Sequence, residues 1–182
     1  MNTKPYPFQA EDATRIADEF NGRCLVASDP GVGKTLISLL YLVNNPSIRP
    51  AVVICPASVK YHWAAEASRH VGMRSEILWG TRPGRGGFPI KRPLTVLNYD
   101  ILFAWIDWLR ELNPQIIILD ESHYCAGRRT RRTKAVKALC RGIPHVLALS
   151  GTPLINRPAE LWPILNILRP DLFPTFFPFG LR

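Results

Sequence analysis

The residues Ser28-Asp29-Pro30-Gly31-Val32-Gly33-Lys34-Thr35 follow a short apolar run at 24–27 and precede a segment with apolar residues at helical spacing. A buried strand, then a glycine-rich loop, then a helix that opens with Lys and Thr is the pattern of a phosphate-binding loop. Ser28 stands where this pattern begins with glycine, and a small residue still fits there. The stretch therefore predicts a nucleotide-binding α/β domain.

The residue types of this loop suit a triphosphate. Gly31 and Gly33, with Val32 between them, let the backbone form a tight concavity whose N–H groups point inward. Lys34 can reach the β- and γ-phosphates, and Thr35 can ligate Mg²⁺ while the helix N-terminus faces the phosphates. The alternative is a glycine-rich turn that merely precedes a helix, and the flanking strand and helix argue against it.

Composition narrows the class of protein. With 182 residues, 47% hydrophobic and 20% charged, the chain suits one globular domain. Its formal net charge of +9 suggests a polyanionic partner such as nucleic acid. We find no signal peptide and no apolar run of membrane-spanning length, so we expect an intracellular protein, cytoplasmic or in the nucleoid or nucleus, without membrane contact. The scattered cysteines indicate neither zinc nor disulfides, and Cys24 and Cys55 are predicted core residues.

Apolar runs and helical periodicities alternate along the chain. Strands are predicted at 24–27, 51–55, 76–79, 94–97, 115–119 and 145–149. Helices are predicted at 11–20, 36–43, 58–70 with Ser58 as N-cap, 99–112, 129–139 and 158–168. Residues 80–92 read as a Gly/Pro/Arg-rich loop, and the tail from 169 shows no period. This alternation predicts a mostly parallel sheet with helices on both faces.

Two adjacent carboxylates follow the apolar run at 116–119. Asp120 and Glu121 are expected at the carboxyl end of that strand, where ligands bind in open α/β sheets. Asp120 would hold Mg²⁺, and Glu121 would orient and deprotonate the water that attacks the γ-phosphate. Read alone, an Asp-Glu pair after a strand also suits an ordinary helix N-terminus.

A third strand end carries two hydroxyl groups. The apolar run at 146–149 leads into Ser150-Gly151-Thr152-Pro153. Ser150 and Thr152 could hydrogen-bond to the carboxylates and sense the γ-phosphate. A turn with a helix N-cap gives the same pattern, so this segment gains meaning only beside the other two.

Basic residues gather in one part of the chain. Seven of the 23 Lys and Arg residues lie between positions 128 and 141, namely Arg128, Arg129, Arg131, Arg132, Lys134, Lys137 and Arg141. Together with the arginines of the 80–92 loop they suggest contacts to DNA phosphates, which would be nonspecific and salt-sensitive. The alternative is a solvated helix face. Tyr99, Trp105 and Trp108 could stack on bases, although aromatics on an amphipathic helix more often belong to the core.

Taken together, these motifs resemble the first motor domain of superfamily-2 helicases, and most closely the Swi/Snf-type double-strand DNA translocases. The phosphate loop resembles motif I, Asp120-Glu121-Ser122-His123 the DEAH-like motif II, and Ser150-Gly151-Thr152 motif III, in the order of the family. Residues 53–58 followed by Trp63 are similar to motif Ia of that branch, and Asn98-Tyr99-Asp100 to its next DNA-contacting segment.

Segments outside these motifs extend the resemblance to nearly the whole chain. Phe8-Gln9 is similar to the upstream glutamine motif that reads adenine, although a surface glutamine is the simpler alternative. Residues 157–162, with the tail at 177–182, look like the annealing-helicase branch that remodels replication forks.

The resemblance implies a RecA-like P-loop NTPase domain over residues 1–182, with ATP and Mg²⁺ as cofactors and duplex DNA, bound without sequence specificity, as partner. Catalysis is expected from Lys34, Asp120 and Glu121, and Mg²⁺ binding from Thr35 and Asp120. Nucleotide binding is expected from Gln9, Gly31, Val32, Gly33, Lys34 and Thr35. Coupling is expected from His123, Ser150 and Thr152. Nucleic-acid contacts are expected from Pro56, Ser58, Trp63, Asn98, Tyr99, Arg128, Arg129, Arg131 and Arg132.

The resemblance also implies a second RecA-like domain, which these residues do not contain and which would act in cis or in trans. That domain supplies an arginine finger, which contributes about 10³ to 10⁵ in rate. We therefore expect an ATP hydrolase of the helicase or translocase type that binds nucleotide and hydrolyses it weakly alone. The alternatives are a nucleic-acid-binding accessory module with the same fold and no motor activity, and a P-loop ATPase that is not a motor.

Overall fold

Six strands form one sheet in which every neighbouring pair is parallel. The computed structural model describes residues 3–81, 91–153 and 157–180. The spatial order is β1-β6-β5-β2-β4-β3. The strands are β1 (Arg23–Val26), β2 (Ala51–Cys55), β3 (Ser75–Ile77), β4 (Leu94–Asn98), β5 (Ile116–Leu119) and β6 (His145–Leu149).

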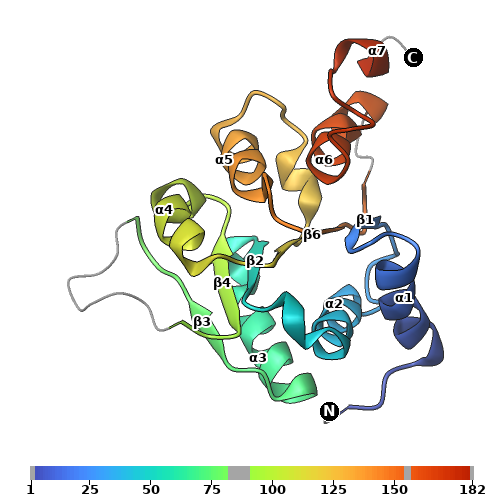
Figure 1. Ribbon diagram of the computed structural model, residues 1–182, viewed down its shortest axis with the longest axis vertical. Helices are drawn as coiled ribbons and strands as arrows, with labels where there is room; N and C mark the ends of the chain where they lie inside the picture. Colours follow the sequence, from blue (N-terminus) through green and yellow to red (C-terminus); the bar gives the residue numbers. More distant parts are fainter. Residues whose placement is uncertain (1–2, 82–90, 154–156, 181–182) are drawn as a thin grey trace.

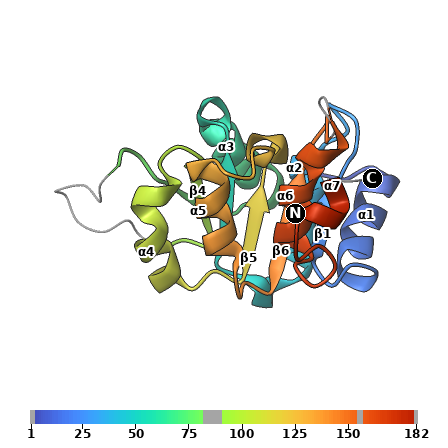
Figure 2. The same ribbon diagram turned by 90° about the horizontal axis from the view of Figure 1, so that it is seen from above.

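Helices cover both faces of this sheet, as Figures 1 and 2 show. One face carries α1 (Pro7–Asp18), α2 (Lys34–Asn44) and α3 (Lys60–Val71); the other carries α4 (Leu102–Leu112), α5 (Arg131–Cys140) and α6 (Trp162–Leu168). Single 3₁₀ turns lie at η1 (Pro46–Ile48), η2 (Ala57–Val59), η3 (Ser122–Cys125) and η4 (Pro158–Leu161), and the short α7 (Phe177–Gly180) follows α6. None of these described helices is long and apolar enough to cross a membrane. The predicted α/β class with two helical layers is confirmed.

The central strands show why this sequence makes a sheet buried on two sides. In β5, Ile116 and Ile118 join the core beneath α1, α2 and α3, while Ile117 and Leu119 join the core beneath α4, α5 and α6. Successive side chains of a strand point to opposite faces, so a strand covered on both faces must be apolar throughout. Parallel pairing also requires each strand to be followed by a crossover, which the intervening helices provide.

The boundaries of several elements differ from the predictions. Ser58 is not an N-cap, because residues 57–59 form the turn η2 and α3 begins at Lys60 with Val59 before it. The helix predicted from Tyr99 begins at Leu102. The prediction for the last helix is split into η4 and α6. Proline explains two of these differences, since Pro56 and Pro158 each precede or open a 3₁₀ turn.

The two predicted core cysteines are confirmed. Cys24 and Cys55 are buried, and burial raises the pKa of each thiol to about 12. Both thiols therefore act as small apolar side chains rather than as nucleophiles.

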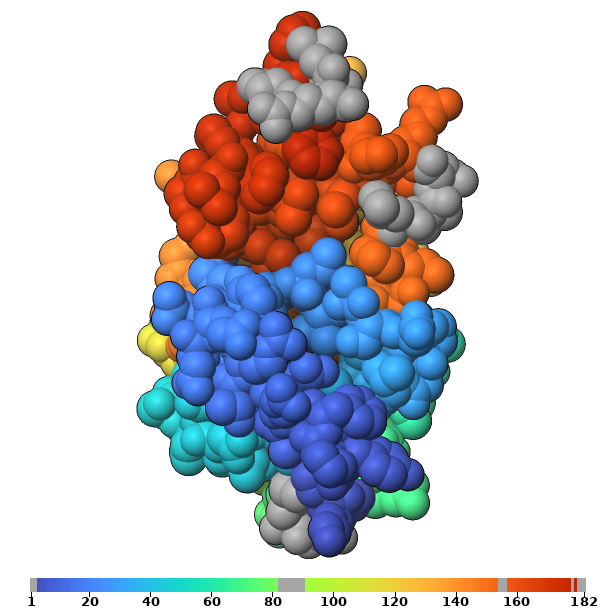
Figure 3. All heavy atoms as spheres, turned by 90° about the vertical axis from the view of Figure 1, so that its right-hand side faces the viewer, coloured from blue at the N-terminus to red at the C-terminus, as the bar shows by residue number. Residues whose placement is uncertain are grey.

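One arginine links the start of β1 to the end of α6. The Arg23 side chain at the start of β1 donates from Nε to Leu168 O at 2.8 Å and from Nη2 to Ile167 O at 2.7 Å, both at the end of α6. These are carbonyls that a helix C-terminus leaves without intrahelical partners. Figure 3 shows that residues of the N-terminal part, in blue, border residues of the C-terminal part, in red.

Candidate functional site

The predicted motif segments that directly follow strands lie at the carboxyl edge of the sheet, because all strands run in the same direction. Sheet order rearranges them. The loops after β1, β6 and β5, which we call the phosphate-loop end, place residues 28–35, 150–152 and 120–123 side by side. The loops after β2 and β4, and the basic segment 128–132 at the start of α5, which Arg132 links to the β4 loop through Asp100, form what we call the β2/β4 end. The motifs expected to bind nucleotide thus lie at one end of this edge, and most of those expected to contact nucleic acid lie at the other.

The loop before α2 has the backbone of a phosphate cradle. Gly31 and Gly33 take left-handed φ angles of 86° and 85°, which glycine adopts without steric cost. A Cβ on Gly31 would meet nothing within 4 Å, so the space above it is open. Ile37 N makes the first intrahelical bond of α2, to Gly33 O, and the N–H groups before it have no intrahelical acceptor. The cradle therefore presents free donors to an anion.

The ammonium group of Lys34 lies within this loop. Its Nζ donates to Ser28 O at 2.9 Å and to Asp29 O at 3.0 Å. Thr35 follows it in the first turn of α2. Both residues therefore adjoin the cradle. The Lys34 ammonium group can give up its hydrogen bonds to the loop carbonyls and donate to phosphate oxygens instead.

Gln9 braces the loop from α1. Its side chain is buried, with Nε2 donating to Val32 O at 2.9 Å and Oε1 accepting from Tyr6 N at 3.0 Å. A Cβ on Gly33 would lie 2.5 Å from Gln9 Nε2, so the loop and this amide pack directly against each other. The simpler alternative, a surface glutamine, is therefore wrong.

Four hydrogen bonds hold Asp120 in place. Its Oδ2 accepts from Trp63 Nε1 at 2.7 Å, and its Oδ1 accepts from Glu121 N at 3.0 Å. Its backbone N donates to Ile54 O at 2.8 Å, and its backbone O accepts from Tyr99 Oη at 2.8 Å. The position and the direction of this carboxylate are thus fixed by the protein.

The electrostatic surroundings of Asp120 link the two motif loops. Burial raises the pKa of Asp120 above its ordinary value, and the neighbouring Glu121 carboxylate adds to this rise. The hydrogen bonds from Trp63 Nε1 and Glu121 N oppose it, as does the positive charge of Lys34. This effect of Lys34 agrees with the sheet order, in which the phosphate loop and the carboxylate loop follow β1 and β5 on either side of β6.

Glu121 differs from Asp120 in exposure and backbone shape. It has a left-handed φ of 48°, and its side chain is 40% exposed. Glu121 Oε2 lies 3.1 Å from His123 Nδ1, but the direction of the contact does not make a hydrogen bond. One carboxylate is therefore locked and the other is accessible to water, which suits the two different roles expected of them.

The turn after β6 packs on the phosphate loop. A Cβ on Gly151 would lie 3.0 Å from Pro30 Cγ, and Ser150 N donates to Val26 O at 3.2 Å. Ser150 Oγ accepts from Thr152 N at 3.2 Å, which closes the turn on itself. Among the hydrogen bonds of the described residues, neither hydroxyl contacts Asp120 or Glu121. The expected coupling contacts of Ser150 and Thr152 are therefore not formed in this structure.

At the β2/β4 end the structure corrects three expected nucleic-acid contacts. The side chains of Trp63, Asn98 and Tyr99 are only 0%, 6% and 2% exposed. Trp63 donates to Asp120, and Tyr99 stacks on Tyr124 with ring centroids 5.4 Å apart. Trp105 and Trp108 are also core residues, as the alternative for these aromatics predicted. By contrast, Ser58 is exposed and Pro56 is partly exposed.

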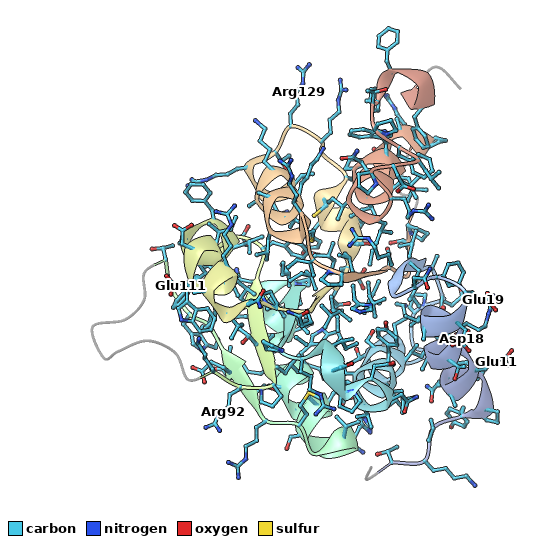
Figure 4. All side chains as sticks on the ribbon, in the orientation of Figure 1. Glu11, Asp18, Glu19, Arg92, Glu111 and Arg129 are labelled. Atoms are coloured by element: carbon cyan, nitrogen blue, oxygen red, sulfur yellow. The ribbon has the colours of Figure 1, made fainter. Side chains whose placement is uncertain are left out.

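The four predicted arginines are not equivalent. Arg128, Arg129 and Arg131 are exposed, and Figure 4 shows Arg129 pointing away from the sheet. Arg128 lies over the Phe176 ring at 3.9 Å and Arg131 over the Phe103 ring at 4.1 Å. Arg132 instead donates from Nη2 to Asp100 Oδ1 at 2.7 Å and covers the Tyr124 ring. Its guanidinium is therefore committed within the protein. Arg82 and Arg85 lie outside the described residues.

Residues 15–180 match the family described as the SNF2-related domain. The chain belongs to this family. It is 34% identical over 177 residues to a Xenopus tropicalis protein named SWI/SNF-related matrix-associated actin-dependent regulator of chromatin subfamily A-like protein 1, covering 97% of the chain and 18% of that relative. It is 30% identical over 191 residues to the mouse DNA annealing helicase and endonuclease ZRANB3, covering 100% of the chain and 18% of that relative. This SNF2-related domain thus spans 18% of the length of these two relatives.

A solved structure supports the same assignment. The SNF2-related domain is similar to the Sulfolobus solfataricus SWI2/SNF2 ATPase core in complex with dsDNA, with a TM-score of 0.82 and 25% identity. The match covers 100% of this chain and 39% of that one. The RecA-like fold and the Swi/Snf family expected from the motifs are both confirmed.

Two residues of the SNF2-related domain hydrogen-bond to Asp120, which the sequence did not reveal. Both were expected to contact nucleic acid, yet Trp63 donates to the carboxylate of Asp120 and Tyr99 donates to its backbone O. Trp63 falls on the apolar stripe of its helix with Val59 and Ala67, and this stripe was the available signal for its burial. Nothing in the sequence indicated that Asp120 would accept from its N–H group, because Asp120 follows β5 whereas Trp63 follows β2.

Proposed function

We propose that this SNF2-related domain is the Mg·ATP-binding half of a DNA-dependent ATPase or translocase. The observation that carries the proposal is the placement of the Lys34 loop and of the Asp120-Glu121 pair after β1 and β5, at one edge of the sheet with only β6 between them, while Glu121 remains accessible. A locked carboxylate, an accessible carboxylate and a phosphate cradle with a lysine are the parts that phosphoryl transfer to water requires.

Mg²⁺ fits the donor set of the phosphate-loop end. Among the described residues, no cluster of three His, Cys, Asp or Glu side chains is available to a metal ion. Mg²⁺ suits such a place, because it is commonly held by one or two protein oxygens together with substrate phosphates and water. Asp120 and Thr35 would supply those protein oxygens. When bound, the ion neutralises charge that develops on the phosphate oxygens.

The other residues of the site would have separate roles in binding ATP and in hydrolysing it. The backbone N–H groups of the cradle bind phosphate oxygens, and Lys34 moves from the loop carbonyls to the β- and γ-phosphates. Gln9 keeps the cradle in shape through its bond to Val32 O. Glu121 orients the attacking water and accepts its proton, which requires the accessible position that its side chain has.

DNA would lie along the β2/β4 end. Ser58 and the exposed Arg128, Arg129 and Arg131 offer hydrogen bonds and positive charge to phosphates, without reading bases. The net charge of +9 favours such binding, and the similar Sulfolobus ATPase core is itself in complex with dsDNA. A protein with this activity would work where DNA is, in a nucleus or nucleoid. A second RecA-like domain would complete the motor and supply the arginine finger.

The proposal is tested by titrating the purified 182-residue chain with a fluorescent ATP analogue, with and without Mg²⁺, and by measuring phosphate release with and without duplex DNA. We expect Mg²⁺-dependent binding and slow hydrolysis that DNA stimulates little. Strong DNA-stimulated hydrolysis would contradict the half-motor proposal. DNA binding without any nucleotide binding would favour the accessory module instead.

A further inference from the structure

The only polar group of the Trp63 side chain, its indole N–H, donates to the carboxylate of Asp120. The indole is fully buried in α3, and a buried tryptophan N–H needs an acceptor. Trp105 and Trp162 satisfy this need with backbone carbonyls, Gly80 O at 2.9 Å and Thr175 O at 3.1 Å. Trp63 Nε1 instead donates to Asp120 Oδ2 at 2.7 Å. A hydrogen bond to an ionised acceptor is stronger than one to a neutral carbonyl, so this bond is the most consequential of the three.

The bond fixes a degree of freedom that the backbone leaves open. Asp120 N and Asp120 O are both hydrogen-bonded, which places the Cα atom and the peptide planes but not the side-chain torsion. Within the described residues, the carboxylate itself has hydrogen bonds only from Trp63 Nε1 and Glu121 N. Each carboxylate oxygen has two acceptor directions, so both oxygens keep one direction free for a ligand. Without the indole N–H, a single backbone donor would orient the group.

The indole is itself rigidly mounted. Trp63 belongs to the apolar core beneath α1, α2 and α3, and it lies in the first turn of α3. Lys60, at the start of the same turn, is buried and donates from Nζ to Leu78 O at 3.0 Å. A side chain with two torsion angles in a packed core loses little further entropy when it holds a ligand group in place.

We propose that Trp63 is a positioning residue, which directs the Asp120 carboxylate toward the Mg²⁺ ion of a bound Mg·nucleotide. The inference rests on the proposed function, because it needs Mg²⁺ at Asp120. It assigns Trp63 to the nucleotide site rather than to nucleic acid. Its loss should weaken the Mg²⁺-dependent part of nucleotide affinity and leave the Mg²⁺-independent part intact.

The test compares Trp63→Phe with Trp105→Phe. Each substitution keeps a buried aromatic ring and removes one tryptophan hydrogen bond, so Trp105→Phe is a matched control for lost packing and stability. The dissociation constant of a fluorescent ADP analogue is measured with Mg²⁺ and with EDTA, and thermal unfolding is recorded for each variant. We expect Trp63→Phe to weaken binding with Mg²⁺ roughly 10-fold and to leave binding in EDTA unchanged. The Trp105→Phe control should match wild type in both conditions.

Equal Mg²⁺ dependence in the two variants would overturn the inference. If wild type itself shows no Mg²⁺-dependent binding, the proposed function fails; if wild type binds and Trp63→Phe matches it, only the inference fails. The indole ¹⁵N–¹H resonances of wild type give a second readout that survives a misfolded variant. The chain has five tryptophans, so the Trp63 resonance can be assigned by elimination from Phe variants of the other four. Adding Mg²⁺ to the ADP complex should shift that resonance, and an unmoved resonance would count against the inference.

Discussion

The phosphate-loop end and the β2/β4 end of the sheet edge differ in the groups that they offer to a ligand. At the phosphate-loop end the important groups are backbone N–H donors, two left-handed glycines and carboxylates directly after a strand. At the β2/β4 end they are long side chains whose direction decides whether they face solvent or core. Three of the side chains expected to contact nucleic acid there are buried. Backbone sites follow from residue spacing, whereas side-chain surfaces depend on how neighbouring elements pack.

The strongest test of the phosphate-loop end is Glu121→Gln. The amide keeps the shape of the side chain but cannot accept the proton of the attacking water, and a general base contributes about 10² to 10⁴ in rate. We expect single-turnover ATP hydrolysis to fall by roughly that factor, while the affinity for the ATP analogue stays within about 2-fold of wild type.

Glu111→Gln is the matched control, since Glu111 is exposed on α4, far from the motif loops, as Figure 4 shows. It should hydrolyse ATP at the wild-type rate. Loss of binding in Glu121→Gln, or an unchanged rate, would contradict the separate roles given to the two carboxylates.

The next largest effect is expected for Lys34→Ala. Lys34 contributes charge-assisted hydrogen bonds to phosphates, and losing two of them costs about 3 kcal/mol, or about 100-fold in affinity. Isothermal titration with Mg·ATP should show this loss. Lys4→Ala, which removes an exposed lysine outside the motifs, should bind as wild type does. Retained affinity in Lys34→Ala would mean that the cradle binds phosphate without its lysine.

The fold was predictable to a large extent because the strands are so uniform. The runs at 51–55 and 145–149 coincide with β2 and β6, since an apolar strand bounded by proline or polar residues has few other ways to be buried. Helix starts were less predictable. At 57–59 the chain makes a 3₁₀ turn before α3, and the difference between a 3₁₀ and an α-helical start is small in energy.

The candidate site was predictable where one loop suffices. The loop at 28–35 has the glycine conformations that its spacing required. The bond between Trp63 and Asp120 joins residues 57 positions apart, on the elements that follow two neighbouring strands. Residue types alone cannot show such a contact, because it depends on strand order, and the order β5-β2 was not available from the motifs. The same limit explains why Arg132 was grouped with its exposed neighbours.

At the β2/β4 end, the triple variant Arg128→Ala, Arg129→Ala, Arg131→Ala should weaken duplex binding about 10-fold at moderate salt. Each phosphate contact contributes about 0.9 to the slope of log affinity against log salt, so the slope should fall by up to about 2.7. Fluorescence anisotropy over a salt series measures both quantities.

A control triple variant replaces Arg15, Arg110 and Arg169 with alanine. These arginines are exposed and lie at the C-terminal ends of α1, α4 and α6, toward the opposite edge of the sheet. It changes net charge equally, so it separates contact from overall charge. Equal losses in the two triple variants would show that the duplex responds only to net charge, and the β2/β4 end would then have no special place in DNA binding.

The smallest effect concerns two adjacent arginines with opposite surroundings. The Arg132 side chain is 33% exposed, paired with Asp100 and placed 5.0 Å from the Tyr124 ring centroid, whereas Arg131 is exposed beside Phe103. We expect Arg132→Ala to lower the free energy of unfolding by about 1 kcal/mol, and Arg131→Ala by about 0.5 kcal/mol or less. DNA affinity should respond in the opposite order, because only Arg131 has a guanidinium free for phosphate. Urea unfolding and anisotropy on the same two variants test this crossed pattern. If Arg132→Ala weakens DNA binding more without loss of stability, its pairing with Asp100 must open when DNA binds.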